Sequence, residues 1–389
     1  MFPPNFSSLN LRHILALSRF MLHHVPLGTG SIGSSHLIVA QDAPSAEDAR
    51  PSRTAILVDA GLQLPELVRR LSKCGVSASE IAAVFVTHEH EVNTRYLSEV
   101  MEATGAPLMA TRGTLAALAE DMYPGVEPRR LPKWLSEATA IKPHWPVTVG
   151  RVTMEAASTV HGEMVGRPAT PTPCEEPVAY GVSEAATGAR LAIITDTGRP
   201  TQSLRRIARH CDALFVETNY DLGILMGRGN PSVSDHYKGF LTSSLGHLSN
   251  KLGVQFAADH ISPRLKAVVL GNLAEEFNAP SHVLAEGVSV LGAAGFDGCV
   301  GISHQDAVGP CVSIAEAGSV VVKPMRATVD RRLTGEEVGA GESPQVELSN
   351  LAVHGVTVAD QMPEPSVETH ARSGPRQAVA SGRRGRVRR

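Results

Sequence analysis

The chain has 389 residues, which is long enough for one large domain or two of medium size. Hydrophobic residues make up 42% and charged residues 19%, so the composition fits a globular core and excludes a wholly disordered or fibrous chain. With 36 basic and 39 acidic residues the net charge is −3, so nucleic-acid binding would need a local site. The five cysteines are dispersed and form no CxxC pair, which excludes a cysteine zinc ribbon and predicts a cytoplasmic protein. No apolar run is long enough for a bilayer span, so we expect no membrane partner.

The two ends of the chain differ from its middle. Residues 1–20 are predicted to be an N-terminal extension, because their apolar patch is too short for a signal peptide, and Met21 offers an alternative start. Residues 324–389 are rich in Arg, Gly and Pro and have little apolar surface to bury, which predicts a disordered tail. The domain is therefore expected over residues 21–323.

Between these ends, short β runs alternate with segments of helical periodicity. Strands are predicted, in chain order, at Met21–Leu27, His36–Ala40, Thr54–Asp59, Ala83–Thr87, Val152–Ala157, Val178–Val182, Leu191–Thr195, Ala213–Glu217, Ala267–Leu270 and Val312–Val322. Helices are predicted at Leu64–Lys73, Arg95–Thr104, Arg112–Asp121, Thr201–Ala208, Tyr237–Leu252 and Ala279–Ala293. Both halves place helices after strands, which favours an α/β fold of two sheets with helices outside over one doubly wound sheet.

Imidazoles and carboxylates follow the apolar strands at their C-terminal ends. Asp59 and Asp196 each close a strand, His88 and His90 follow a third, and His161 lies just past a fourth. Side chains two apart in an extended segment project the same way, so His88 and His90 can chelate one cation. Neutral imidazoles with a carboxylate suit zinc, with manganese or iron as alternatives. The sequence therefore predicts a metal site at the strand ends.

Three segments then resemble a known family. Residues 87–93, THEHEVN, resemble the HxHxDH signature of the metallo-β-lactamase superfamily. Residues 246–250, GHLSN, and residues 270–278, LGNLAEEFN, resemble segments of its YycJ-like (WalJ-like) group of DNA exonucleases and phosphodiesterases. The resemblance covers about residues 21–295 and implies an αββα sandwich with metals at the sheet edges.

The resemblance also implies roles for the strand-end residues. His88, His90 and His161 would hold the first ion, with Asp196 as a further ligand or as the group that holds the water. Asp59 would orient a ligand without touching the ion.

The second ion of the family pattern lacks its ligands here. It would need an aspartate at position 92 and histidines at positions 93 and 272, where this chain has Val92, Asn93 and Asn272. Valine has no lone pair, and asparagine binds such ions poorly. Since all three departures fall on one ion, we expect one divalent ion in each chain.

Two other motifs mimic unrelated sites. Residues 28–33 satisfy GxGxxG, but a strand follows where dinucleotide binding needs a helix, so a glycine-rich hairpin turn is the better interpretation. Residues 196–198, DTG, resemble an aspartic protease loop, but such an enzyme needs a second carboxylate and no second DTG is present.

The leading hypothesis is a metal-dependent hydrolase that acts on a phosphodiester substrate, perhaps as a nuclease in the cytoplasm, through a single-metal-activated water. Asp196 and His247 are the expected catalytic residues: Asp196 would orient the water, and His247 would contact the substrate phosphate or the leaving oxygen. An alternative is a non-catalytic binding or scaffolding protein of the same fold that has lost its second metal site. A third hypothesis makes the basic tail the contact of a nucleic-acid-associated accessory protein.

Overall fold

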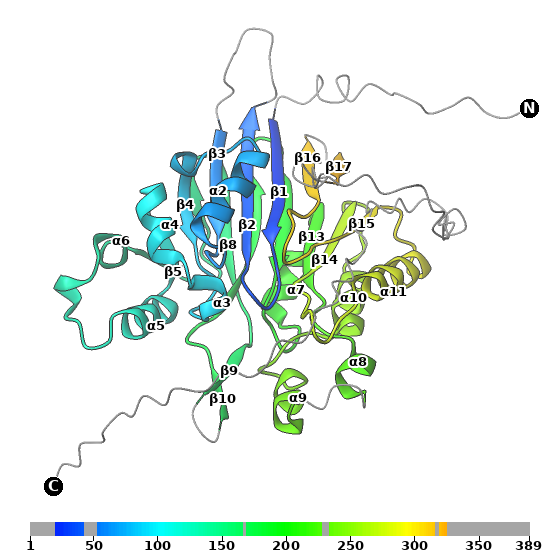
Figure 1. The fold of residues 1–389 in the computed structure, drawn as a ribbon. Helices are drawn as coiled ribbons and strands as arrows, with labels where there is room; N and C mark the ends of the chain where they lie inside the picture. The colour runs from blue at the N-terminus through cyan, green and yellow to red at the C-terminus, as the bar shows by residue number, and fades with distance from the viewer. Residues whose placement is uncertain (1–19, 43–52, 166–168, 228–232, 316–318, 325–389) are drawn as a thin grey trace, which may run out of the picture.

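The computed structural model describes residues 20–42, 53–165, 169–227, 233–315 and 319–324. Two large sheets pack face to face and helices cover their outer faces (Figure 1). The first sheet has the order β17-β16-β1-β2-β3-β4-β5-β6 and the second has the order β15-β14-β13-β12-β11-β8-β7. This arrangement is the predicted αββα sandwich.

The strands of the first sheet are β1 (Phe20–Gly28), β2 (Ser35–Asp42), β3 (Arg53–Val58), β4 (Ile81–Phe85), β5 (Leu108–Thr111), β6 (Thr139–Ile141), β16 (Cys311–Ala315) and β17 (Val320–Lys323). Those of the second sheet are β7 (Val147–Val149), β8 (Val152–Ser158), β11 (Val178–Glu184), β12 (Ala189–Ile194), β13 (Ala213–Glu217), β14 (Ala267–Gly271) and β15 (Cys299–Ile302). A separate hairpin pairs β9 (Gly162–Val165) with β10 (Thr170–Pro173). The runs β3 to β6 and β12 to β15 are parallel, so within each sheet their carboxyl ends meet at one edge.

The helices are α2 (Leu64–Lys73), α3 (Glu91–Thr94), α4 (Leu97–Thr104), α5 (Arg112–Met122), α6 (Lys133–Ser136), α7 (Gln202–Ala208), α8 (Leu222–Met226), α9 (Asp235–Leu241), α10 (Asn250–Ala258) and α11 (Pro280–Ala293), with short 3-10 turns η1 (Ala78–Glu80) and η2 (Pro128–Arg130). None of the described helices has the length and apolar character needed to cross a membrane.

The core has three apolar layers. Between the sheets, Phe85 and Tyr180 meet edge to face at 5.5 Å, and strand residues from both sheets complete the layer. Outside the first sheet, β1 to β5 pack against α2, α4 and α5, and outside the second, β12 to β15 pack against α7, α10 and α11. Burial on both faces explains why these strands are near-continuous apolar runs.

Two predicted elements were wrong in extent. The helix expected over Tyr237–Leu252 is two helices, because α9 ends at Leu241 and α10 begins only after Ser249, whose hydroxyl accepts from the Leu252 amide at 3.3 Å. Gly246 lies in the turn between them, where a Cβ would come within 2.2 Å of the Leu241 carbonyl oxygen. The run Val312–Val322 is the antiparallel pair β16 and β17.

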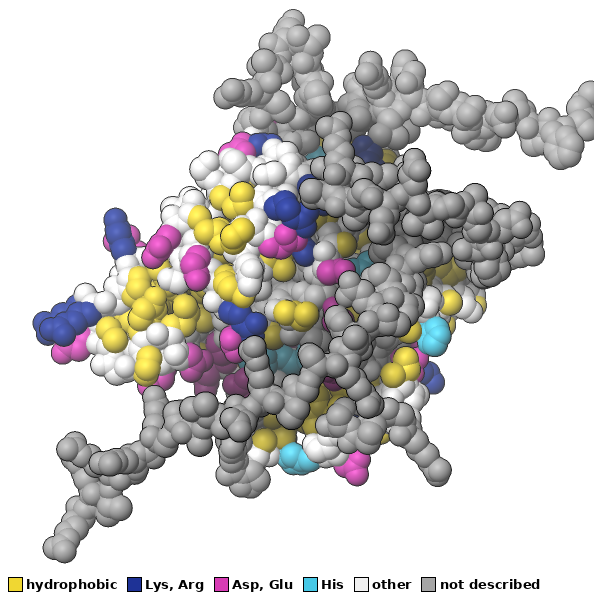
Figure 2. Space-filling model, in the orientation of Figure 1, with side chains coloured by type: hydrophobic (Ala, Val, Ile, Leu, Met, Phe, Trp, Pro, Cys, Tyr) yellow, Lys and Arg dark blue, Asp and Glu magenta, His cyan; other side chains and the backbone are white. Residues whose placement is uncertain are grey.

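The GxGxxG segment lies in the hairpin turn between β1 and β2, as the strand after it indicated. The predicted domain limits stay predictions: the described strands run from Phe20 to Lys323, and both the N-terminal extension and the tail fall outside the described residues. On the face shown in Figure 2, basic and acidic side chains of the described residues are interspersed, in line with the balanced composition.

Candidate metal centre

Three imidazoles converge where β4 and β8 end. His88 and His90 follow β4, and His161 follows β8. His88 Nε2 and His90 Nδ1 lie 3.0 Å apart, and the His161 ring lies 5.0 Å from the His88 ring and 4.8 Å from the His90 ring. One ligand atom from each of the three lies within 4.8 Å of the others, so one ion could contact all three.

A relay of hydrogen bonds orients His88. Its Nδ1 lies 2.9 Å from the Thr87 hydroxyl, which in turn lies 2.9 Å from the Asp59 carboxylate. Asp59 also accepts from the Thr87 amide at 2.8 Å and is fully buried. With Asp59 ionised, the hydroxyl donates to its carboxylate and accepts from His88 Nδ1, which turns His88 Nε2 toward the cluster. There Nε2 lies 3.0 Å from His90 Nδ1 and 3.3 Å from Asn93 Nδ2.

The other two rings are tethered on their outer sides as well. His161 Nδ1 lies 2.9 Å from the Gly246 carbonyl oxygen, which can only accept, so its Nε2 is the free nitrogen. His90 Nε2 lies 3.1 Å from the Cys174 thiol, so His90 turns Nδ1 toward the cluster. The backbone amide of Cys174 donates to the His161 carbonyl oxygen at 3.0 Å, which holds the thiol in place.

Burial keeps these imidazoles neutral. It lowers the pKa of His88 to about 4 and that of His90 to about 3, and it holds the pKa of His161 well below its usual value. A neutral imidazole is the form that binds a metal. The chain therefore presents three neutral imidazoles that converge on one point, and this donor set fits a divalent ion.

Asp196 lies at the end of β12, beside the cluster, and two asparagine amides face it. Asn272 Nδ2 donates to Asp196 Oδ1 at 2.9 Å, and Asn93 Nδ2 lies 3.4 Å from Oδ2. Burial alone would raise the pKa of Asp196, but His88 and the neighbouring imidazoles outweigh it and hold the pKa below the ordinary range. Asp196 is thus an ionised acceptor at the edge of the imidazole cluster.

Glu217, at the end of β13, is the most heavily hydrogen-bonded carboxylate of the centre. Its Oε1 accepts from the Leu248 amide at 2.8 Å, and its Oε2 accepts from the Asp196 amide at 3.0 Å and from Asn272 Nδ2 at 2.6 Å. Oε2 also lies 2.8 Å from His247 Nδ1. Burial would lower the pKa of His247, but the charge and hydrogen bond of Glu217 outweigh it and raise that pKa above its usual value.

The structure brings most of the expected site residues together. His88, His90, His161, Asp196 and His247 form two overlapping groups of potential ligands that share His161. Asp59 reaches the cluster only through a threonine, and the amides at positions 93 and 272 occupy the side of Asp196 where the second ligand set was expected.

Val92 differs from the other expected positions. It is half-buried on α3, and its carbonyl oxygen accepts from the Ser34 amide at 3.1 Å. No described contact links its side chain to Asp196.

Two contributors to the centre could not be predicted from the sequence. No local pattern links Cys174 to His90 across 84 positions of the chain. The Gly246 carbonyl oxygen is a backbone group and carries no sequence signal. Glu217, in contrast, could be predicted to line the pocket, since it ends an apolar strand as Asp59 and Asp196 do.

Curated relatives match about two thirds of this chain. The exodeoxyribonuclease WalJ of Streptococcus pneumoniae is 25% identical over 253 residues, which are 65% of this chain and 81% of the relative. The exodeoxyribonuclease YycJ of Bacillus anthracis is 24% identical over 258 residues, which are 66% of this chain and 84% of the relative.

Solved structures show the same fold. The metallo-β-lactamase fold protein YhfI of Bacillus subtilis aligns with a TM-score of 0.50 at 18% identity, over 74% of this chain and 98% of its own. Zn²⁺-bound PqqB of Methylobacterium extorquens aligns with a TM-score of 0.50 at 15% identity, over 74% of this chain and 99% of its own. The family model of a β-lactamase superfamily domain matches residues 54–268, which is more than half of the chain. The family predicted from the motifs is thereby confirmed: the chain belongs to the β-lactamase superfamily.

Proposed function

We propose that this metal-dependent hydrolase cleaves phosphodiester bonds with one divalent ion, held by His88, His90 and His161. The observation that carries the proposal is the convergence of the three rings. Each has its outer nitrogen within hydrogen-bond distance of a protein group, at Thr87, Cys174 and the Gly246 carbonyl oxygen. The inner nitrogens face one another: His88 Nε2 lies 3.0 Å from His90 Nδ1, and one ligand atom of each ring lies within 4.8 Å of the others. Three neutral imidazoles held in this way are the kind of nitrogen donor set that binds a divalent ion. Zinc is the ion that this ligand set favours most.

The ion would supply a Lewis acid that polarises a phosphoryl oxygen and lowers the pKa of water. Asp196 stays ionised and lies beside the imidazoles, so it can accept a hydrogen bond from a water molecule and orient that water toward the phosphorus. His247 is the only one of the four clustered imidazoles with a raised pKa, and 17% of its side chain is exposed. It can therefore donate a proton to the leaving oxygen while Glu217 holds its Nδ1.

The amide of Asn272 supports a single ion. Its nitrogen donates to Asp196 Oδ1 at 2.9 Å, and a donor N–H at that distance would repel a cation placed between the two side chains. The amide N–H group thus stabilises the negative charge of Asp196, as a second ion would otherwise do.

The substrate class rests on the relatives, both of which are named exodeoxyribonucleases. We propose a DNA strand as the substrate and an internal phosphodiester near its end as the reacting bond.

Metal content and hydrolysis of a model phosphodiester, measured together, test this proposal. The parent should hold about one ion per chain and hydrolyse the substrate, and His88→Ala should lose both. A rebuilt variant carrying Val92→Asp, Asn93→His and Asn272→His should take up a second ion, because Asn93 and Asn272 already face Asp196. Glu91→Gln is the matched control, since Glu91 lies one residue from the ligands but its side chain is 74% exposed and pairs with Arg95.

Two results would contradict the proposal. Two ions in the parent at full occupancy would refute the single-ion centre. A parent that binds its ion but hydrolyses neither DNA nor a model phosphodiester would favour the non-catalytic binding protein instead.

A further inference from the structure

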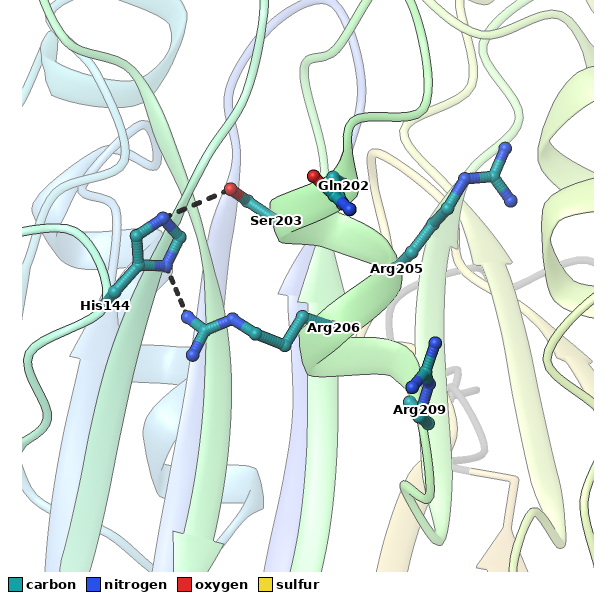
Figure 3. A pocket seen from close by; sticks show the side chains of 6 residues that line it. All are labelled: His144, Gln202, Ser203, Arg205, Arg206 and Arg209. Carbon is teal, nitrogen blue, oxygen red and sulfur yellow. Dashed lines mark hydrogen bonds between the residues drawn. The ribbon is translucent and has the colours of Figure 1, made fainter.

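Helix α7 carries a basic pocket outside the metal centre. Arg205, Arg206 and Arg209 line a pocket of about 450 Å³ together with His144, Gln202 and Ser203 (Figure 3). All three arginines are exposed. In Figure 3, Arg206 reaches toward His144, whereas Arg205 and Arg209 project from the other side of the helix. Three guanidinium groups within two turns of one helix are a concentration of charge that the balanced composition of the chain does not predict.

The acidic neighbours neutralise this charge only in part. Arg206 pairs with Glu155, and Arg205 lies 3.6 Å from Asp259. Arg209 has no acidic partner among the described residues. Arg205 is 46% exposed and Arg206 is 49% exposed, and ion pairs at that exposure hold their partners weakly. A phosphate, which accepts two parallel hydrogen bonds from a guanidinium, could therefore compete for them.

The pocket adjoins the segment that delivers His161. Thr201 caps α7, and its hydroxyl donates to the carbonyl oxygen of Ser158, the last residue of β8, at 2.9 Å. From Ser158 the chain continues to His161, whereas α7 runs away from this contact. Seven residues of helix rise by about 10 Å, which is the length of about three stacked nucleotides of one strand. The N-terminal end of α7 is thus the end nearer the segment of His161, and its C-terminal end lies about three nucleotides further away.

An exposed aromatic ring follows the pocket residue His144. Trp145 is 70% exposed, which is unusual for so large an apolar side chain. The His144 amide donates to the Ala156 carbonyl oxygen at 2.8 Å, and the Trp145 amide donates to the Lys142 carbonyl oxygen at 3.1 Å, so the turn is fixed against β8. Trp145 is thus an exposed aromatic residue directly after a residue of the arginine-lined pocket. Aromatic rings and guanidinium groups together bind single strands, because bases stack on the ring while phosphates pair with the charges.

We propose that the α7 pocket binds the phosphates of a single strand of nucleic acid, with Trp145 stacking against a base, and that it holds the strand whose end lies in the metal centre. This inference rests on the proposed function for the identity of the substrate. It adds a strand-binding site on a different element, made of residues that do not touch the proposed ion.

Fluorescence anisotropy tests the strand site directly. The full chain with its ion would be titrated against a labelled phosphorothioate oligothymidylate of about 20 nucleotides, which resists cleavage but keeps its charge, between about 50 and 200 mM salt. The variant Arg205→Gln, Arg206→Gln, Arg209→Gln should bind at least about tenfold more weakly, and its salt slope should be shallower by about 2, because each lost phosphate contact removes about 0.7. Trp145→Ala should weaken binding by about tenfold.

The matched control is Arg129→Gln, Arg130→Gln, which removes two exposed arginines of η2 that share Glu127 as their partner. It should bind like the parent. An uncharged methylphosphonate strand of the same length should bind the parent no better than it binds the α7 variant.

Two results would overturn the proposal. The α7 variant could bind as tightly as the Arg129 and Arg130 control. The methylphosphonate strand could bind the parent as tightly as the charged one. Binding needs no hydrolysis, so a strand site in a protein that cleaves no phosphodiester would refute the proposed function and leave this inference standing.

Discussion

Replacing Glu217 by glutamine tests whether its carboxylate holds the metal centre together. The side chain is fully buried and accepts four hydrogen bonds, three at Oε2 and one at Oε1. Glutamine has nearly the same shape, so Glu217→Gln removes the charge and one acceptor while creating almost no cavity.

The cost can be estimated contact by contact. If the glutamine carbonyl oxygen takes the Oε2 position, the glutamine NH₂ group faces the Leu248 amide. Two donors then oppose each other in a buried site, which costs about 1–3 kcal/mol of stability. The three bonds at the other oxygen lose their charge assistance, at about 1 kcal/mol each. Relief from burying a carboxylate offsets part of this sum. We therefore expect the free energy of unfolding to fall by about 3 kcal/mol.

Urea denaturation of the chelator-treated chain measures this change without a contribution from bound metal. Glu163→Gln is the matched control: its carboxylate lies 3.7 Å from His90 Nε2 but is 57% exposed, so the free energy of unfolding should change by less than about 0.5 kcal/mol. If Glu217→Gln cost no more than Glu163→Gln, the four contacts would not act as described.

Three further results are expected. Cys174→Val should weaken binding of the ion by about 10- to 100-fold in competition with a chromogenic chelator, because His90 Nε2 loses its partner, whereas Cys174→Ser should stay near the parent; equal affinity in both variants would refute the orienting role. His161→Ala should reduce the ion content measured by elemental analysis to well below one per chain, and full occupancy would remove His161 from the ligand set. Burial lowers the pKa of His36 from 6.5 to about 3, so the folded chain loses stability as the pH falls from 6.5 toward 3, where only the unfolded chain takes up the proton. His36→Phe should therefore flatten the pH dependence of the unfolding free energy by about 1.4 kcal/mol per pH unit between pH 6 and about 4. An unchanged slope would show that His36 is protonated in the folded chain.

Much of the fold could be predicted because buried strands are recognisable in the sequence as apolar runs. The strands predicted at Ala213–Glu217 and Ala267–Leu270 match β13 and β14 to within a residue, since strands covered on both faces are continuous apolar runs. The helix predicted at Leu64–Lys73 has the bounds of α2, which has a strongly amphipathic pattern and a proline in its first turn.

Two of the strands that were not predicted lack such patterns. Strand β10 is Thr-Pro-Thr-Pro with every residue exposed, and β6 has two exposed residues out of three, so neither shows an apolar run. The break between α9 and α10 depends on how closely Gly246 approaches the Leu241 carbonyl, which is a tertiary contact. Helical periodicity on either side of such a break gives no warning of it.

The candidate site divides in the same way. Strand-end positions such as Asp196 could be predicted, because an apolar run followed by a polar residue marks the edge of a parallel sheet. The α7 pocket could not, because His144 and Arg206 lie 62 positions apart and only the packing of α7 on β8 brings them together.

The left-handed backbone at position 272 explains why asparagine suits a centre with one ion. Asp196 and Asn272 both have positive φ angles, 51° and 55°, in a region that asparagine and aspartate tolerate better than most residues. From that position one amide nitrogen reaches two buried carboxylates, Asp196 at 2.9 Å and Glu217 at 2.6 Å, which would otherwise repel each other. In the proposed centre, one divalent ion on three neutral imidazoles would balance the two carboxylates, and His247 would be the group whose charge changes when an anionic phosphodiester arrives. A second ion would upset this balance unless Asn272 were also replaced, and for that reason the rebuilt centre needs the whole set of substitutions rather than any one of them.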